Sequence, residues 1–240
     1  MHIVFLQNWP SEDMGRLRAI LVANNVDLTI VEAYRIPTPS NNPIYPNLAN
    51  VDGIIIGGTP ISISILNDAL WTEKQYIIQA ISHNRPILGI CGGCQLLVKL
   101  LGAEIHLNPV PEVGITEIFL SQEGKHHALF TGFPPTFHAF QWHEETYTLP
   151  PGGIQLATTP TCKQQACGCS ICFGIQFHLE TRPEDITQWT TEFLTSTQED
   201  QILQRHLIAQ SHEFEAELEH LAKLLMKNFL SIIIADKRAN

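Results

Sequence analysis

Short apolar runs rich in branched side chains alternate with segments of helical period through the first hundred residues. The apolar runs are His2–Gln7, Val26–Val31, Val51–Ile56 and Pro86–Ile90, and the helical segments are Glu12–Asn24, Asp68–His83 and Gln95–Leu101. This rhythm is typical of parallel strands joined by right-handed crossover helices. Ile54-Ile55-Ile56 lacks the polar alternation of a half-exposed strand, as expected for a strand buried on both faces. The pattern therefore predicts an α/β fold with an open, doubly wound, mostly parallel sheet flanked by helices.

The pattern changes after residue 103. Shorter strand candidates follow, separated by proline and glycine: Glu104–Leu107, Thr116–Leu120, Phe137–Trp142, Ile154–Thr158 and Ile171–His178. We expect these segments to add antiparallel strands beside the parallel core. From Pro183 onward the pattern is helical, and Gln201–Ile234 carries apolar residues at three- and four-residue spacing. Residues 1–198 are thus expected to form one α/β domain, with residues 199–240 as a C-terminal helical extension packed on it.

Charge and composition argue against several classes of protein. The chain has 240 residues, a formal net charge of −10 and no basic run, which argues against binding nucleic acid. The start of the sequence has no signal-peptide pattern, and the apolar stretch Leu224–Ala235 is interrupted by Lys227 and Asn228. We therefore expect a cytoplasmic protein that does not enter a membrane, with its six cysteines as free thiols.

Gly89-Ile90-Cys91-Gly92-Gly93 follows a predicted strand and opens a predicted helix. This is the G-x-nucleophile-x-G pattern of a nucleophile elbow, with cysteine in place of serine. Glycines two positions to either side allow the strand and the helix to approach while the thiol projects above the sheet. The positive end of the helix dipole stabilises a thiolate there. Cys91 is therefore the candidate nucleophile.

A cysteine nucleophile needs a base and a group that orients the base. The segment Gly174–Glu180 predicts a strand that runs into a His-x-Glu sequence. Strand geometry places the side chains of His178 and Glu180 on the same side of the chain. Glu180 can then hold one imidazole nitrogen while the other faces the thiol of Cys91, provided that this strand end lies beside the elbow.

Two motifs carry a family resemblance. Gly89–Gln95 reads G-I-C-G-G-C-Q, and Gly174–Glu180 reads G-I-Q-F-H-L-E. They resemble the G-[IV]-C-x-G-x-Q and G-[VIL]-Q-F-H-P-E patterns of the class I glutamine amidotransferases, the Cys-His-Glu type. Between the motifs, Phe140–Glu144, Leu149–Gly152 and Gln165-Ala166 resemble stand-alone members similar to the amidotransferase domain of GMP synthetase, and also plant γ-glutamyl peptidases. The resemblance covers most of the chain and implies a flavodoxin-like amidotransferase domain over residues 1–198.

The resemblance also implies a reaction: hydrolysis of a γ-glutamyl amide, glutamine to glutamate and ammonia, through a cysteine thioester. It implies Cys91 as nucleophile, His178 as base and then acid, and Glu180 as the group that orients His178. The backbone N–H groups of Gly58 and Gly92 are the candidate oxyanion hole.

Further residues are expected to bind the substrate. By the same resemblance these are Gln95 and the backbone near Trp142, His143 and Glu144. No cofactor and no metal are expected. The expected partners are a small γ-glutamyl substrate, glutamine first, and a separate ammonia-accepting synthetase subunit, because few residues follow Glu180.

Three positions differ from the family pattern. The loop Gly57–Ser62 reads G-G-T-P-I-S, one residue longer before the proline than the usual G-G-P-x-S. Leu179 replaces a proline between the histidine and the glutamate, and Cys94 adds a second thiol near Cys91. Two alternatives to glutamine hydrolysis stay open: a γ-glutamyl peptidase acting on a larger compound, and a catalytically inactive binding module.

The cysteines also admit interpretations without catalysis. Cys91 could be a small buried apolar residue, or it could form a C-x-x-C redox pair with Cys94, although Gln95 and the glycines favour the amidotransferase. A second group comprises Cys162, Cys167, Cys169 and Cys172. Their spacing does not give two C-x-x-C pairs, and on a strand Cys167 and Cys169 would share one face with Cys172 on the other. We therefore expect packed or exposed thiols there, and no metal site.

Overall fold

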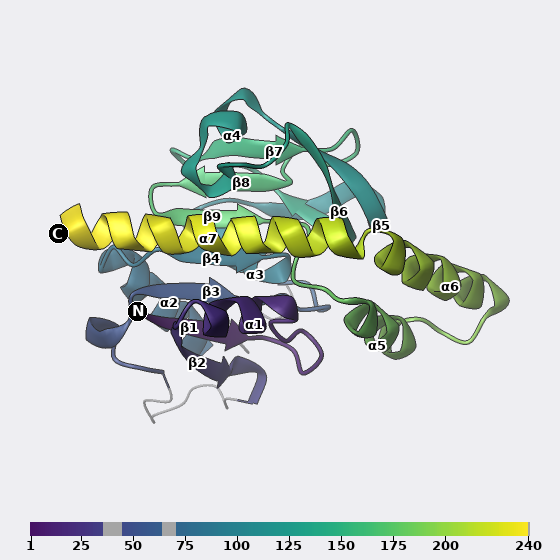
Figure 1. Cartoon of the computed structure of the whole chain (residues 1–240), viewed down its shortest axis with the longest axis horizontal. Helices are drawn as coiled ribbons and strands as arrows, with labels where there is room; N and C mark the ends of the chain where they lie inside the picture. Colours follow the sequence, from purple (N-terminus) through teal and green to yellow (C-terminus); the bar gives the residue numbers. More distant parts are fainter. Residues whose placement is uncertain (36–44, 64–70, 240) are drawn as a thin grey trace.

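The computed structural model describes residues 1–35, 45–63 and 71–239. Its described residues form a nine-stranded sheet in the order β2-β1-β3-β4-β9-β8-β7-β5-β6 (Figure 1). The strands are β1 (His2–Gln7), β2 (Asp27–Glu32), β3 (Gly53–Ile56), β4 (Ile87–Ile90), β5 (Ile105–Leu120), β6 (Thr136–Tyr147), β7 (Ile154–Thr158), β8 (Ala166–Cys169) and β9 (Cys172–Ile175). Strands β2, β1, β3, β4 and β9 are parallel, and the other four join antiparallel. The predicted mostly parallel, doubly wound sheet with antiparallel additions is confirmed.

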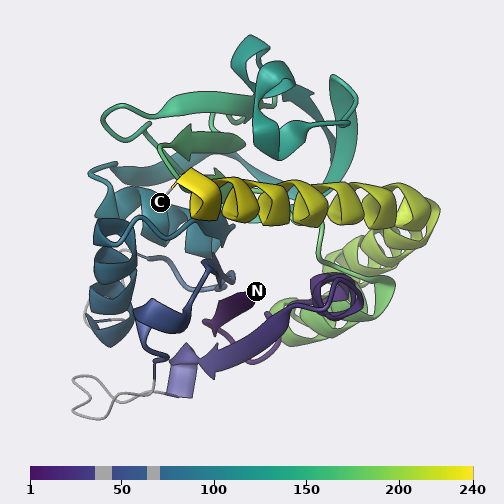
Figure 2. The same ribbon diagram turned by 60° about the vertical axis from the view of Figure 1, so that its left-hand side comes forward.

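Helices cover both faces of the parallel strands (Figures 1 and 2). They are α1 (Arg16–Ala23), α2 (Trp71–Ser82), α3 (Gly92–Leu100), α4 (Gln122–His126), α5 (Pro183–Phe193), α6 (Gln198–Glu213) and α7 (Glu215–Ala239). Along β1, Ile3 and Phe5 pack with α1 and α7, whereas Val4 and Leu6 pack with α2 and α3. Successive strand residues face opposite layers, which explains the uninterrupted apolar runs. The expected start of the second helix at residue 68 lies outside the described residues.

The segment after residue 198 forms two helices, α6 and α7, which meet at Phe214. Helix α7 runs across the sheet (Figure 2). Its buried apolar face includes Leu225, Phe229 and Ile233. The amide of Asn228 donates hydrogen bonds to the carbonyl oxygens of Leu129 and Thr131, at 2.9 and 2.8 Å. Helix α7 therefore contributes to the same apolar core as α1 and β1.

Strand β5 is longer than the sequence predicts. Two separate strands were expected, Glu104–Leu107 and Thr116–Leu120, with Pro109 and Pro111 between them. The structure instead has one strand, and its pairing with β6 shifts register between Leu107 and Glu112. Such a bulge accommodates prolines, which cannot donate to a sheet ladder.

The β8–β9 hairpin also differs from the sequence-based prediction. The strand expected over residues 171–178 ends at Ile175, and β8 was missed. Cys169 lies directly opposite Cys172 across the hairpin. Residues directly opposite on paired strands project from the same face of a sheet, so the expectation that Cys172 lies on the other face from Cys169 was wrong.

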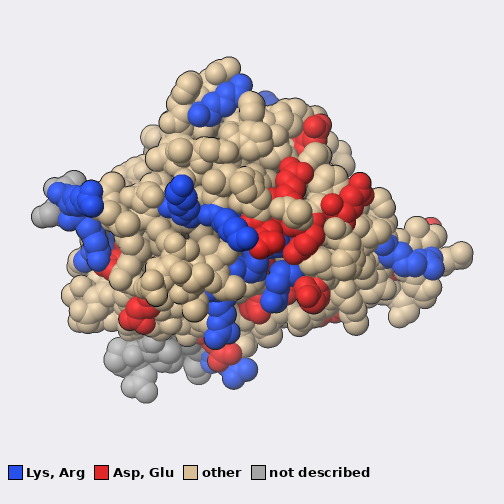
Figure 3. Space-filling model, viewed as in Figure 1, with Lys and Arg blue, Asp and Glu red and all other residues tan. Residues whose placement is uncertain are grey.

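The surface carries both signs of charge. On the face shown in Figure 3, Lys and Arg side chains lie among Asp and Glu side chains. Pairs include Lys223–Glu219 within α7 and Lys237–Asp52, both at 2.6 Å. Among the described residues, no helix combines the length and the apolar character needed to cross a membrane.

Candidate active site

Cys91 lies on the turn between β4 and α3. The strand and the helix touch there, because a Cβ atom on Gly89 would lie 2.6 Å from the carbonyl oxygen of Gly93. Cys91 has φ 49° and ψ −114°, a conformation that residues with side chains rarely adopt. Its N–H donates to the carbonyl oxygen of Ile175 at 2.8 Å and is therefore not free for a substrate. The turn thus holds the thiol at the N-terminus of α3 above the sheet.

His178 follows the end of β9 and is held by its backbone. Its N–H donates to the carbonyl oxygen of Phe140 on β6 at 2.8 Å. Its Nδ1 lies 2.5 Å from Oε1 of Glu180, and both side chains are buried. Burial alone would lower the pKa of His178, but the charges of Glu180 and Cys91 and hydrogen bonds to both raise it well above its usual value. The imidazole therefore stands between the thiol and the carboxylate.

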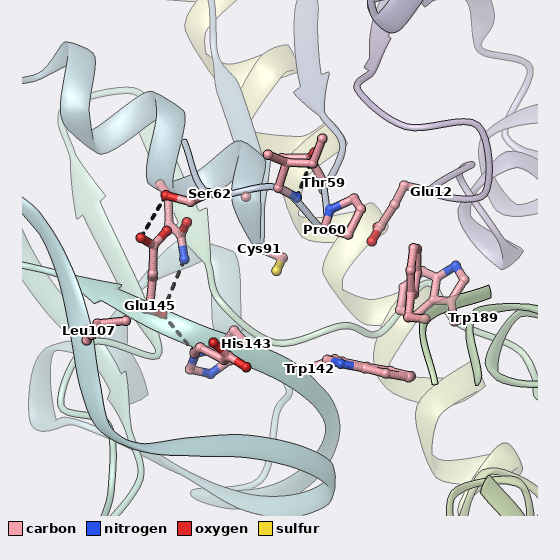
Figure 4. A pocket seen from close by; sticks show the side chains of 15 residues that line it. Glu12, Thr59, Pro60, Ser62, Cys91, Leu107, Trp142, His143, Glu145 and Trp189 are labelled. Atoms are coloured by element: carbon pink, nitrogen blue, oxygen red, sulfur yellow. Dashed lines mark hydrogen bonds between the residues drawn. The ribbon is translucent and has the colours of Figure 1, made fainter. Parts of the chain in front are cut away.

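A cavity of about 460 Å³ opens over Cys91 (Figure 4). It is lined by Glu12, Thr59, Pro60, Ile61, Ser62, Cys91, Gly92, Gln95, Leu107, Trp142, His143, Glu144, Glu145, Trp189 and Phe193. The structure thus brings five of the expected residues to one cavity with Cys91: Gly92, Gln95, Trp142, His143 and Glu144. Gly58, His178 and Glu180 lie outside this lining.

The loop after β3 packs against the first turn of α3. A Cβ atom on Gly92 would lie 3.0 Å from the backbone nitrogen of Thr59. Thr59, and not Gly58, lines the cavity. Gly58 packs instead against the carboxyl group of Glu12, since an added Cβ would lie 2.6 Å from its Oε2. Thr59 is a site residue that the motif comparison missed, because the loop is longer than the family pattern.

Gln95 lines the cavity and is held by two hydrogen bonds. Its Nε2 donates to the carbonyl oxygen of Glu145 at 3.2 Å and to Oε1 of Gln176 at 3.3 Å. The Nε2 of Gln176 lies 3.7 Å from the sulfur of Cys91. On the opposite side of Glu145, its carboxylate accepts a hydrogen bond from Ser62 at 2.8 Å. This polar end of the cavity offers amide, carbonyl and carboxylate groups to a substrate.

His143 is positioned by a buried carboxylate. Its Nδ1 lies 2.9 Å from the carbonyl oxygen of Glu145, and its Nε2 lies 3.0 Å from Oε2 of Glu112. Burial favours a higher pKa for Glu112, but hydrogen bonds from His143, Thr159 and Thr161 outweigh it and lower the pKa. Glu112 was missed because it lies between two predicted strands. Only the pairing of β5 with β6 sets it opposite His143.

Glu12 was also missed as a site residue. It was expected at the start of a helix, but α1 begins at Arg16 and Glu12 lies in the preceding loop. The side chain is 6% exposed, and burial raises its pKa to about 7. A carboxylate oxygen of Glu12, a ring nitrogen of His178 and a carboxylate oxygen of Glu180 all lie within 4.8 Å of one another. No sequence motif marks Glu12, and only the fold brings the loop after β1 to His178.

The other five cysteines do not line the cavity. Cys94 is fully buried with Cys167 and Tyr147, and burial raises its pKa well above the usual value. That environment does not favour a redox pair with Cys91, and all six cysteines are free. Within the described ranges, the groups close enough to share an ion are Glu112–His143–Cys162 and Glu12–His178–Glu180. Of the four later cysteines, Cys162 belongs to the first group, and the described residues place Cys167, Cys169 and Cys172 in neither.

Together, the fold and the site define a class. The molecule is a doubly wound α/β protein with a buried cysteine on a strand-to-helix turn, beside a histidine–glutamate pair and an open cavity. Solved structures share this fold. A glutamine amidotransferase from Thermotoga maritima matches 97% of this chain and 98% of its own, with a TM-score of 0.84 and 22% identity. One from Methylobacillus flagellatus matches 96% and 94%, with a TM-score of 0.81 and 20% identity.

Sequence comparison identifies the family. The family model "Glutamine amidotransferase class-I" matches residues 16–197, so the chain belongs to the class I glutamine amidotransferases. It is 31% identical over 186 residues to the glutamine-hydrolyzing GMP synthase of Aeropyrum pernix, covering 76% of this chain and 34% of that protein. It is 33% identical over 138 residues to a glutamine-hydrolyzing GMP synthase subunit of Sulfolobus acidocaldarius, covering 56% and 70%. The chain thus spans about a third of the length of the first relative.

Proposed function

We propose that this protein is an enzyme that hydrolyses γ-glutamyl amides, with glutamine as the first candidate substrate, through a thioester on Cys91. The observation that carries the proposal is the order Cys91–His178–Glu180. The thiol lies at a helix N-terminus, and the carboxylate lies 2.5 Å from the imidazole. The raised pKa of His178 suits its imidazole to take the thiol proton as a general base.

In the proposed reaction, the thiolate of Cys91 attacks the γ-carbonyl carbon while His178 holds the proton. Negative charge then develops on the carbonyl oxygen. The N–H of Gly92 and a backbone N–H of the adjacent Gly58–Thr59 loop are the proposed donors, and one such donor contributes about 2.7 to 4 kcal/mol. His178 protonates the leaving nitrogen, and the carbon–nitrogen bond breaks to leave a γ-glutamyl thioester.

Water completes the reaction. His178 takes a proton from the water as its oxygen attacks the thioester, and the carbon–sulfur bond breaks. The γ-carboxylic acid releases its proton to solvent and leaves as glutamate, and the proton that His178 took from water remains shared between Cys91 and His178. Glu180 orients the imidazole throughout and stabilises its positive charge. We place the α-amino and α-carboxylate groups at the polar end of the cavity, near Gln95 and the backbone of residues 142–145.

The fate of the ammonia is a separate proposal. The Sulfolobus acidocaldarius relative is named as one subunit of a GMP synthase, and this chain covers 70% of its length. We propose that the ammonia passes to a separate synthetase subunit. The free thiols fit a reducing compartment, and we propose the cytoplasm as the site of action.

We further propose that residues 199–240 are part of the same folding unit as residues 1–198. Helix α7 buries Leu225, Phe229 and Ile233 in the core that contains strand β1. The family model ends at residue 197, so α6 and α7 extend beyond the matched region. Shared burial of this kind makes independent unfolding of the extension unfavourable.

The test is ammonia release from glutamine by the native chain, Cys91→Ala and Cys94→Ala. Activity should be lost in Cys91→Ala and kept in Cys94→Ala, because Cys94 does not line the cavity. A γ-glutamyl diazoketone should label the native chain at Cys91, as shown by peptide mass spectrometry. Loss of activity in Cys94→Ala alone would show that Cys91 is not the nucleophile. Absence of both turnover and labelling would favour the inactive binding module.

A γ-glutamyl peptidase activity is the second candidate. The cavity extends from Cys91 to Trp189 on α5 (Figure 4). Phe193, also on α5, is part of the lining, and this is more space than ammonia needs. A panel of γ-glutamyl dipeptides, assayed beside glutamine for release of the free amine, distinguishes the two activities. A higher kcat/KM for any dipeptide than for glutamine would favour the peptidase.

A further inference from the structure

One wall of the cavity is both acidic and aromatic, and the proposed hydrolysis of glutamine uses none of the side chains that form it. We call it the α5 wall: Glu12, Trp142, Trp189 and Phe193. The rings contact one another edge to face, with centroids 6.5 Å apart for Trp142–Trp189 and 6.0 Å for Trp142–Phe193. In Figure 4, Glu12 and Trp189 lie on one side of Cys91, and Ser62 and Glu145 lie on the other.

Glu12 is 6% exposed, and none of the hydrogen bonds between described residues reaches its carboxyl group. Its carboxyl oxygens are open to the cavity. Its carboxyl points into the cavity from the loop after β1 (Figure 4). His178 is near, but its Nδ1 is already 2.5 Å from Glu180. A carboxyl group that is largely removed from solvent and faces a cavity favours a ligand that supplies a donor or a positive charge.

The charges around the cavity indicate which ligand fits. Three glutamates line it, Glu12, Glu144 and Glu145, and its described lining contains neither lysine nor arginine. On the side of Cys91 where Glu12 lies, the negative potential favours an ammonium group over a carboxylate. Indole faces add to this preference, because a cation within about 6 Å of a tryptophan ring is attracted to its π-system.

In the proposed mechanism, the leaving group is the part of the substrate that lies nearest the α5 wall. His178 protonates the leaving nitrogen, so the leaving group extends from Cys91 toward the side of His178. The ring of His178 lies 5.1 Å from that of Trp189, and its nitrogen lies within 4.8 Å of a carboxylate oxygen of Glu12. The acyl part occupies the other side, at Gln95 and Glu145. The leaving group is therefore the part of the substrate that meets the α5 wall.

We propose that the α5 wall binds a leaving group with an ammonium at its far end, so that the preferred substrates are γ-glutamyl amides of diamines. This inference rests on the proposed γ-glutamyl hydrolysis. Glu12 pairs with the distal ammonium, and Trp142 and Trp189 cover its methylene chain and charge. Water cleaves the amide bond as before, and the products are glutamate and the free diamine. Glu12 is thus a specificity-determining residue.

The test uses three γ-glutamyl amides of matched length that differ at the far end. The leaving amines are 1,4-diaminobutane, n-pentylamine and 4-aminobutyrate, which end in ammonium, methyl and carboxylate. For the native chain, kcat/KM should be at least about tenfold higher for the ammonium compound than for the methyl compound, and lowest for the carboxylate. In Glu12→Gln the ratio of ammonium to methyl should fall close to one. Glu123→Gln, on α4 and away from the cavity, should keep the native ratio.

The outcomes separate this inference from the proposed function. If glutamine or the methyl compound is hydrolysed and the ammonium compound is no better, the α5-wall inference is wrong and the proposed function stands. If no amide is hydrolysed, the proposed function fails, and calorimetric binding to Cys91→Ala decides the inference. Tighter binding of the ammonium than of the methyl compound, by about tenfold, would support it, and equal binding would overturn it.

Discussion

Replacing Glu12 by glutamine should change how stability depends on pH. Burial raises the pKa of Glu12 from 4.5 to about 7. Between these values the folded protein keeps a proton that the unfolded chain has released, so the free energy of unfolding falls as pH rises from about 5 to 7 and then levels off. This pKa difference corresponds to about 3 kcal/mol. Glu12→Gln removes that loss because a glutamine side chain does not titrate.

The measurement is urea unfolding of the native chain and Glu12→Gln at about pH 5 and about pH 8. The stability of Glu12→Gln relative to the native chain should increase by about 3 kcal/mol between the two pH values. Glu73 on α2 is buried with a pKa raised to about 8, but it contributes equally to both proteins and cancels. Glu123→Gln controls for the loss of one charge and should behave as the native chain. An unchanged difference at both pH values would refute the argument from burial.

Three further predictions concern the triad and the helical extension. Glu180→Gln should lower kcat for γ-glutamyl hydrolysis by up to about 10⁴-fold in steady-state assays, because His178 loses the charge that orients it; near-native kcat would contradict this role. Gly15→Ala should lower both kcat and stability, because Gly15 has φ 47° and an added Cβ would lie 2.1 Å from the carbonyl oxygen of Glu180; normal kinetics and urea unfolding would count against this contact. Phe229→Ala should cost about 3 to 5 kcal/mol in one cooperative transition, whereas a separate early transition would show that α7 unfolds independently.

Several strands could be predicted because their signals are local. The first strand, His2–Gln7, and the later strand Ile154–Thr158 have the expected bounds. Each is a short run of apolar and branched residues between polar segments. The strand–turn–helix around Cys91 is equally local, because closely packed glycines and an apolar strand mark it without reference to distant residues.

Features that depend on distant contacts escaped prediction. Strand β8, Ala166–Cys169, has no branched or aromatic residue, and pairing with β7 and β9 makes it a strand. Strand β5 continues through two prolines because β6 supplies partners on both sides of the bulge. Glu112 gains its role only from facing His143 across that strand pair. In each case tertiary pairing outweighs local propensity.

The position of Glu12 follows from the same contacts that hold the triad. The N–H of Arg16, at the start of α1, donates to the carbonyl oxygen of Glu180 at 2.9 Å. The guanidinium of Arg16 donates to the carbonyl oxygen of Thr181 and pairs with Glu215 on α7 at 2.8 Å. These bonds tie the loop after β1 to the segment that carries His178 and Glu180, and so place Glu12 beside the imidazole. The contacts of Arg16 therefore position two residues at once. One is Glu180, which orients the proposed base, and the other is Glu12, which we propose selects the leaving group.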